Sequence, residues 1–146
     1  MEILPYSGQT QLLIIGFKPG ELLLESIREV ISTYGVKNGA VVSGIGTLSK
    51  CRMHYIEHTH FPAQDRIMTL EKPLELNSVN GLIVDGEPHL HIMVSCGEDE
   101  VYGGHLEEDS RVLYLAEIAV LVFNELKMIR QIDPERRIKL LKRFDG

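Results

Sequence analysis

The sequence predicts one mixed α and β domain, built mostly of strands around a single amphipathic helix. Three observations lead to this prediction. First, 146 residues with 44% hydrophobic and 25% charged content fit one globular domain of ordinary composition. Second, short segments of strand-like composition alternate with Gly, Pro and Asn over most of the chain. Third, no linker, low-complexity tract or internal repeat divides the sequence, so we expect residues 1–146 to form a single domain.

The first strand and the helix are the clearest elements of the N-terminal part. QLLIIGF, residues 11–17, reads as a strand, and the turn residues Lys18-Pro19-Gly20 follow it. In GELLLESIREVISTYG, residues 20–35, apolar side chains recur at helical spacing and charged side chains occupy the other side. Gly35 ends the predicted helix.

Residues 39–96 predict a meandering series of strands. PLELNSVNGLIV, residues 73–84, and PHLHIMVS, residues 88–95, are joined by Asp85-Gly86, a pair that favours the positive φ angles of a hairpin turn. Shorter segments of β-leaning composition precede them: GAVVSGIG at 39–46, KCRMHYIE at 50–57 and RIMTLE at 66–71.

The C-terminal part is less clear. RVLYLAEIAVLVFN, residues 111–124, is compatible with a buried helix or with a strand, and its pattern does not decide between them. Asp133-Pro134 has the form of an N-cap followed by proline at the first helical position, so a short last helix is predicted to begin there.

Charge and cysteine content narrow the function and location. Fifteen Lys and Arg against 21 Asp and Glu give a net charge of −6, which disfavours nucleic-acid binding. The basic segment ERRIKLLKR, residues 135–143, is more typical of a solvated helix end. Cys51 and Cys96 form no CxxC pair, and the sequence contains neither a secretion signal nor an apolar run long enough for a membrane span. We therefore expect a cytoplasmic protein with reduced thiols and no membrane partner.

Two alternating histidines suggest a metal site. On a strand, His89 and His91 point to the same face, opposite Leu90 and Ile92, so both imidazoles can converge on one ion. His105 directly follows two glycines that let the backbone come close to a site, and it is the candidate third ligand. Three neutral imidazoles with an open fourth position suit Zn²⁺. The alternative is two histidines on a half-exposed strand and one in an unrelated loop.

Other titratable residues give competing interpretations. His54, His58 and His60 form a second histidine set. His58 and His60 alternate as His89 and His91 do, but they lie in a polar stretch before Phe61-Pro62 that favours an exposed loop. Glu117 is the one charge in the apolar run 112–123. A buried carboxylate needs a partner, and a raised pKa would make it a general base. Alternatively, Glu117 faces water at an edge or a subunit boundary.

Several motifs in a fixed order resemble the PPC domain, the plant and prokaryote conserved domain that is also found beside AT-hooks in plant nuclear proteins. The resemblance covers roughly residues 8–143, and the combination of GIG, HLH and GGHL makes it specific. The segments that carry it are GFKPGELLLESIREV, VVSGIGTLSKCRMHYIE, PLELNSVNGLIVDGEPHLHIMVS, VYGGHL and LAEIAV.

The resemblance implies an α/β fold in which an antiparallel sheet of about seven strands packs against the main helix, with 111–123 as a strand. It also implies a homotrimer. In prokaryotic single-domain members the HLH and GGHL histidines form a metal or active site near the subunit interface, which falls here on His89, His91 and His105. Glu117, in the family's AEV-like segment, belongs near them.

Two departures from the family pattern leave two hypotheses. Many members carry an arginine ahead of the helix, where this chain has Lys18, so Lys18 is the candidate cation. Plant members lack the histidines and owe DNA contact largely to an AT-hook, which has no counterpart here.

The first hypothesis is a zinc-dependent protein, with hydrolysis as its chemistry, in which Glu117 or Lys18 handles protons or an anionic small molecule. The second is a DNA-binding or regulatory module.

Overall fold

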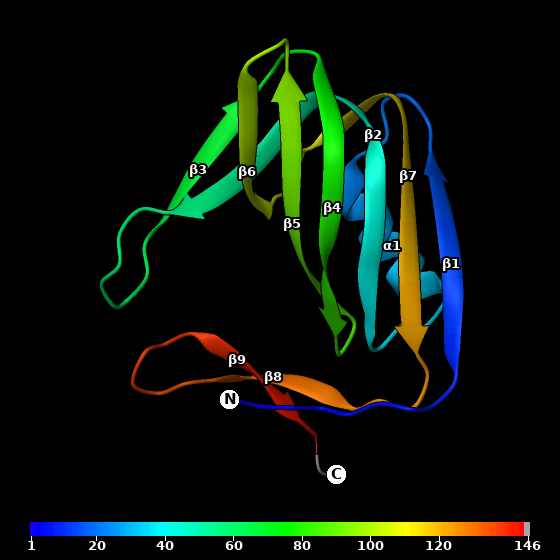
Figure 1. Cartoon of the computed structure of the whole chain (residues 1–146), viewed down its shortest axis with the longest axis vertical. Coiled ribbons are helices and arrows are strands. Elements are labelled where there is room, and N and C mark those ends of the chain that lie inside the picture. The colour runs from blue at the N-terminus through cyan, green and yellow to red at the C-terminus, as the bar shows by residue number, and fades with distance from the viewer. Residues whose placement is uncertain (145–146) are drawn as a thin grey trace.

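A computed structural model describes residues 1–144 and consists mainly of one seven-stranded antiparallel sheet. The strand order is β1-β7-β2-β4-β5-β6, with β3 paired to β2 (Figure 1). This confirms the predicted antiparallel sheet of about seven strands with one main helix. The elements of the sheet and the helix are β1 (Thr10–Phe17), α1 (Leu23–Thr33), β2 (Gly39–Ile56), β3 (Asp65–Leu70), β4 (Leu74–Val84), β5 (Glu87–Cys96), β6 (Glu100–Leu106) and β7 (Arg111–Phe123).

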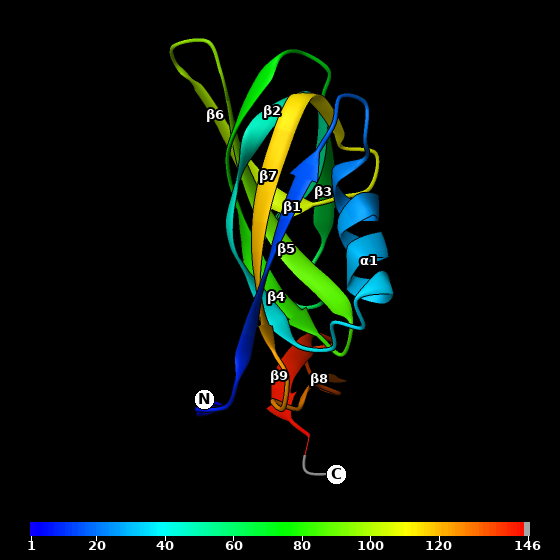
Figure 2. The ribbon, with the colours of Figure 1, turned by 90° about the vertical axis from the view of Figure 1, so that its right-hand side faces the viewer.

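Helix α1 covers one face of the sheet (Figure 2). Leu23, Leu24, Ile27 and Ile31 on the helix are buried, as are the alternate side chains of β7 that point to the same side. No side chain caps the first turn of α1; instead the Leu23 amide donates a 2.8 Å hydrogen bond to the Ser110 carbonyl. The start of the helix is therefore fixed by the chain just before β7. Residues 111–123 form a strand, as the family resemblance implied.

Strand β2 is one 18-residue strand where the sequence predicted two shorter ones. Gly46 lets it pass through the GIG segment without a break: φ is +152°, and a Cβ there would lie 2.4 Å from the Leu115 carbonyl oxygen. The first part of β2 pairs with β4, while its far end pairs with β6 at Met53↔Leu106 and His54↔His105. β2 therefore pairs with both β4 and β6, and β5 pairs with the same two strands, so these four strands form a closed ring of pairings.

The predicted hairpin between β4 and β5 is confirmed. Asp85 and Gly86 have φ angles of +51° and +81°, the positive values that such a two-residue turn requires. On β5, Leu90 and Ile92 are each 1% exposed and lie in the core, whereas the side chains between them point to the other face. The alternation in PHLHIMVS thus reflects a strand with one buried face.

The predicted short C-terminal helix is wrong. Strands β8 (Met128–Ile132) and β9 (Lys139–Arg143) form a hairpin instead. Asp133 does accept hydrogen bonds from the Glu135 and Arg136 amides, at 3.1 and 2.7 Å, as an N-cap would. A single turn follows, and then Arg137, with φ of +57°, sends the chain back along β8. Asp133 therefore caps one turn, as the sequence predicted, but the chain then pairs as β9 with β8 instead of continuing as a helix.

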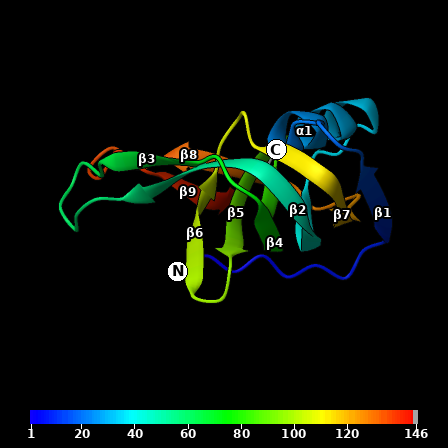
Figure 3. The ribbon, with the colours of Figure 1, turned by 90° about the horizontal axis from the view of Figure 1, so that it is seen from above.

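The β8–β9 hairpin lies at one end of the sheet, near the N-terminus (Figure 1). Seen from above, it lies beneath the part of the sheet formed by β3, β5 and β6, away from α1 and β1 (Figure 3). Within residues 1–144, no helix has both the length and the apolar composition needed to cross a membrane.

Candidate metal centre

The three histidines predicted as ligands meet on adjacent strands. His89 and His91 lie on the face of β5 opposite its buried residues, and His105 on β6 is the direct cross-strand partner of His91. The ring centres are separated by 5.5 Å for His89–His91, 4.9 Å for His89–His105 and 5.7 Å for His91–His105. The sheet therefore gathers into one cluster the residues that sequence spacing selected.

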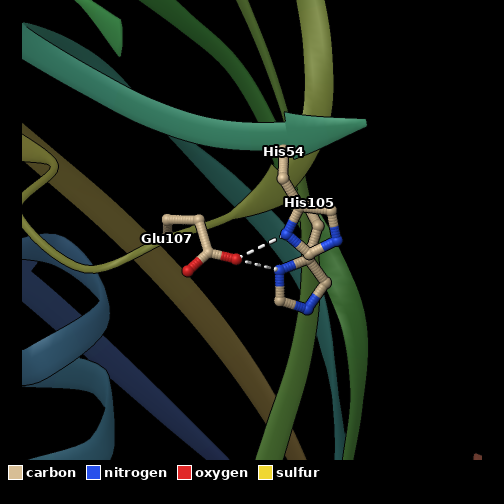
Figure 4. Close-up of side chains that lie close together, drawn as sticks. All are labelled: His54, His105 and Glu107. Carbon is tan, nitrogen blue, oxygen red and sulfur yellow. Dashed lines mark hydrogen bonds and ion pairs between the residues drawn. The ribbon is translucent and has the colours of Figure 1, made fainter. Parts of the chain in front are cut away.

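A fourth histidine and a carboxylate join this cluster. Because the end of β2 pairs with β6, the ring of His54 stacks on that of His105 at 4.5 Å. Glu107 follows His105 by two positions, and its Oε1 lies 2.6 Å from Nδ1 of His54 and 3.1 Å from Nδ1 of His105 (Figure 4). Among residues 1–144, the potential ligand atoms that all lie within 4.8 Å of one another belong to His54, His105 and Glu107.

The hydrogen bonds at Glu107 fix which nitrogen of each ring is available. Burial raises the pKa of Glu107, but hydrogen bonds from His54 and His105 outweigh it, so the pKa of this carboxyl lies below its usual value. An ionised carboxylate only accepts hydrogen bonds, so each Nδ1 carries the proton that it donates. In the neutral ring, Nε2 then keeps the lone pair that a metal requires. A carboxylate on the far nitrogen of a histidine ligand is a common feature of metal sites.

Two of the histidines are held in the neutral form. Burial lowers the pKa of His105, and the neighbouring His54 lowers it further, against the opposing effect of Glu107. Burial also lowers the pKa of His89, with smaller contributions from His105 and Arg130. Because metals bind neutral imidazole, both rings are ready for a ligand role at pH 7.

These pKa shifts predict that the metal-free protein loses stability as the pH falls. The pKa values of His89 and His105 lie below the value of about 6.5 expected in the unfolded chain, so the unfolded state binds more protons in the window just below pH 6.5. The free energy of unfolding should therefore be lower at pH 5.5 than at pH 7.5, measured by urea denaturation with a chelator present. A His89→Gln, His105→Gln variant should show a smaller difference. Greater stability at pH 5.5 would contradict the assignment.

The second histidine set is divided by the structure. His58 and His60 lie in the loop between β2 and β3, as expected. His54 lies on β2, which continues through Ile56, in agreement with the strand predicted for residues 50–57. The sequence held a signal for Glu107, which alternates with His105 and so shares its side of the chain. It held none for His54, whose place depends on the pairing of β2 with β6.

Glu117 and Lys18 lie elsewhere in the single chain. Glu117 is exposed in the middle of β7, opposite Gly16 and Ile45, so the interpretation as a buried carboxylate does not hold within one subunit. Lys18 is exposed in the turn before α1, where its backbone amide donates a 2.6 Å hydrogen bond to Glu21. Neither residue lines the cavity beside the histidines. Their catalytic roles stay predictions that require a second subunit.

A cavity of about 900 Å³ opens beside the cluster. All four histidines line it, together with residues of the β8–β9 hairpin. This volume lies in the range typical of sites for small molecules. The hairpin contributes Arg130, Ile138 and Lys139 to the lining.

Comparison with solved structures supports the fold. A plant- and prokaryote-conserved protein from Pyrococcus horikoshii is 26% identical, covering 97% of this chain and all of that chain (100%), with a TM-score of 0.77. A metal-containing protein from Archaeoglobus fulgidus is 25% identical, covering 96% of this chain and 98% of that one, with a TM-score of 0.74. A candidate DNA-binding protein from Bacteroides thetaiotaomicron is 16% identical with a TM-score of 0.80 over 97% of this chain and 98% of that one, which shows the fold alone.

Sequence relatives and a family model complete the comparison. The bifunctional protein GlmU of Synechococcus sp. (strain JA-3-3Ab) is 25% identical over 128 residues, which are 88% of this chain but 20% of that protein. The chain thus spans about a fifth of the curated relatives it matches. Residues 5–124 match the model of the Plants and Prokaryotes Conserved (PCC) domain, another name for the family that the motifs resemble. This chain therefore belongs to the Plants and Prokaryotes Conserved domain family.

Proposed function

We propose that this protein is a homotrimeric zinc protein that binds and hydrolyses a small molecule at a subunit interface. The proposed zinc ligands are His89, His91 and His105. The observation that carries the proposal is the meeting of these three rings, from adjacent strands, at the wall of one cavity. The metal-containing relative from Archaeoglobus fulgidus supports it.

The ring spacing fits zinc. Imidazoles that bind one tetrahedral zinc at about 2.0–2.1 Å place their ring centres roughly 5 Å apart. The separations of 4.9, 5.5 and 5.7 Å are close to this value, and binding one ion requires the rings to rotate until one nitrogen of each points to it. His54 and Glu107 form a competing set with His105, because their ligand atoms lie nearer to one another. We favour Glu107 as the group that orients His105, since both Nδ1 contacts point to that role.

A division of labour among the side chains follows. Bound Zn²⁺ supplies the Lewis acidity that hydrolysis of a carbonyl or phosphoryl compound requires. Glu107 fixes the tautomer and the orientation of His105 and His54. His54, which lines the cavity, is placed to exchange a proton with a ligand. In the trimer, we propose that Glu117 or Lys18 of a neighbouring subunit reaches this site and handles protons or an anionic group.

A trimer would cover the open face of the sheet. The face opposite α1 exposes large apolar side chains around the carboxylate of Glu117, which is exposed on β7. Contiguous exposed apolar surface of this kind commonly marks a protein interface. The residues that form it are Leu12, Ile14, Val42, Ile45 and Leu115.

We expect Ile45→Glu to dissociate the trimer. Ile45 is 51% exposed and lies directly opposite Glu117, so the new carboxylate would meet an existing one in an apolar interface. Light scattering should report monomers for Ile45→Glu and trimers for the wild type. Tyr34→Glu is the control, because Tyr34 is 66% exposed at the end of α1, on the other side of the sheet. Equal masses for all three proteins would contradict this use of the open face.

A DNA-binding module is the second candidate, and a structural neighbour with that description motivates it. The net charge of −6 and the open apolar face make it the weaker one. Titration of duplex DNA at 50 and 200 mM salt separates the two. Salt-sensitive binding that does not require the histidines would favour the DNA-binding module.

Metal content tests the main proposal directly. Protein purified without chelator and without a metal-affinity column should contain about one zinc ion per chain. The zinc-loaded protein should hydrolyse p-nitrophenyl acetate or p-nitrophenyl phosphate faster than the chelated protein. Zinc-free protein that also fails to take up added zinc would overturn the proposal.

A further inference from the structure

The C-terminal hairpin contributes a positively charged side chain to the cavity that the histidines line. Arg130 lies on β8 and lines the cavity together with the four histidines. The hairpin begins at Met128, beyond residues 5–124 that the family model matches, so family membership assigns it no role.

Arg130 is held in place by uncharged partners. Its Nη1 donates a 3.0 Å hydrogen bond to the Glu87 carbonyl, and its Nη2 donates a 3.1 Å hydrogen bond to the Leu82 carbonyl. Both acceptors belong to the backbone near the β4–β5 turn. They fix the plane of the guanidinium without neutralising its charge, and they leave further N–H donors for a ligand.

Four other arginines differ in this respect. Within residues 1–144, the arginines with a carboxylate within 4.0 Å are Arg28, Arg66, Arg111 and Arg136. Arg130 is half-buried, and burial lowers its pKa, with only partial opposition from the charge of Glu87. A guanidinium remains charged under these conditions, so a partly buried cation faces the cavity.

The rest of the cavity wall shows where an anion would be bound. Lys139 adds a second cation from β9. Two carboxylates, Asp65 and Glu87, also line the wall, and Asp65 lies 3.8 Å from Nε2 of His54. The hairpin thus supplies the positive charge of the wall, and the carboxylate of Glu87 partly opposes that of Arg130. Arg130 is hydrogen-bonded to the carbonyl of Leu82, the cross-strand partner of His89, so Arg130 lies close to one of the histidines.

We infer that Arg130 binds the oxyanion group, a carboxylate or phosphate, of a small molecule whose other end reaches the histidines. The planar guanidinium matches both groups with two parallel hydrogen bonds. This inference rests on the proposed function for the reaction at the histidines, whereas the anion subsite itself is formed by the hairpin. The ligand of this site is then a small anionic molecule.

The test uses metal-free protein, so that it does not depend on zinc. The full chain is titrated with inorganic phosphate and, separately, with malonate at constant ionic strength. Binding is followed through the ¹H–¹⁵N signals of the arginine side chains. We expect the Arg130 signal to shift with at least one of the two anions. Arg130→Gln should weaken binding by roughly tenfold or more, because a hydrogen bond to a charged group is lost.

Two variants serve as controls. Arg136→Gln removes the same charge from the same hairpin outside the cavity and should leave anion binding unchanged. Arg130→Lys keeps the charge without the planar fork and should bind with intermediate affinity. The wild-type Arg130 signal keeps the test decisive even if a substitution displaces the hairpin.

The outcomes separate this inference from the proposed function. A response to phosphate alone, to malonate alone or to both supports the subsite and identifies its group. An Arg130 signal that does not move, or equal binding by wild type and Arg130→Gln, overturns it. Loss of duplex DNA binding in Arg130→Gln, with no response to either small anion, also overturns it. Normal zinc content with no anion binding refutes the subsite alone, while anion binding in a chain that takes up no zinc refutes the metal proposal alone.

Discussion

Replacing His89 and His91 together with alanine is expected to remove the zinc ion while leaving the subunits assembled. Loss of a group that only orients a ligand typically costs 10- to 100-fold in metal affinity, so loss of two ligands should cost more than about 100-fold. Both side chains point away from the buried face of β5, so the metal-free fold should change little. Elemental analysis at matched concentration, with light scattering for the oligomer, measures both effects.

The chain offers a matched control for this experiment. His58 and His60 have the same spacing but lie in the loop between β2 and β3. Their double alanine variant should keep its zinc. If the His89, His91 variant also keeps its zinc, the metal belongs to the competing set of His54, His105 and Glu107. Our choice of ligands would then be wrong.

Replacing Gly104 with alanine is expected to destabilise the fold beside the site. A Cβ at Gly104 would lie 2.5 Å from the His54 carbonyl oxygen and 3.3 Å from Met53 Cγ. Because the closest atom is backbone, β6 must move away from β2, and His54 then separates from His105. Overpacking of this kind costs about 1–3 kcal/mol of the free energy of unfolding. Zinc affinity should fall as well, because the support of His105 by Glu107 is disturbed.

The neighbouring glycine is the control. A Cβ at Gly103 would lie 3.4 Å from the Ile92 carbonyl oxygen and 3.6 Å from Met93 Cγ, distances of ordinary contact. Gly103→Ala should therefore change stability by about 0.5 kcal/mol or less. Urea denaturation of the metal-free proteins at one protein concentration provides the comparison. Equal losses for the two variants would show that the contact between β2 and β6 does not limit the fold.

The local pattern of the sequence determined a large part of this protein. The alternation of His89 and His91 with Leu90 and Ile92 identified a strand with one buried face, because side chains alternate with a period of two. Asp85-Gly86 identified the turn for the same local reason. The helical spacing of residues 20–35 identified α1. Each of these depends on neighbours within a few positions.

The tertiary structure alone decided which distant residues join the site. His54 reaches His105 because β2 is long enough to pair with β6. Local composition does not specify the register between strands that lie about 50 residues apart in the sequence. Arg130 joins the histidines at one cavity because the hairpin of β8 and β9 brings it to the backbone carbonyls of Leu82 and Glu87. There the sequence signal at Asp133 specified only a cap, which forms one turn. A helix this short gains little stability from its own hydrogen bonds. Residues 139–143 instead form backbone hydrogen bonds with β8.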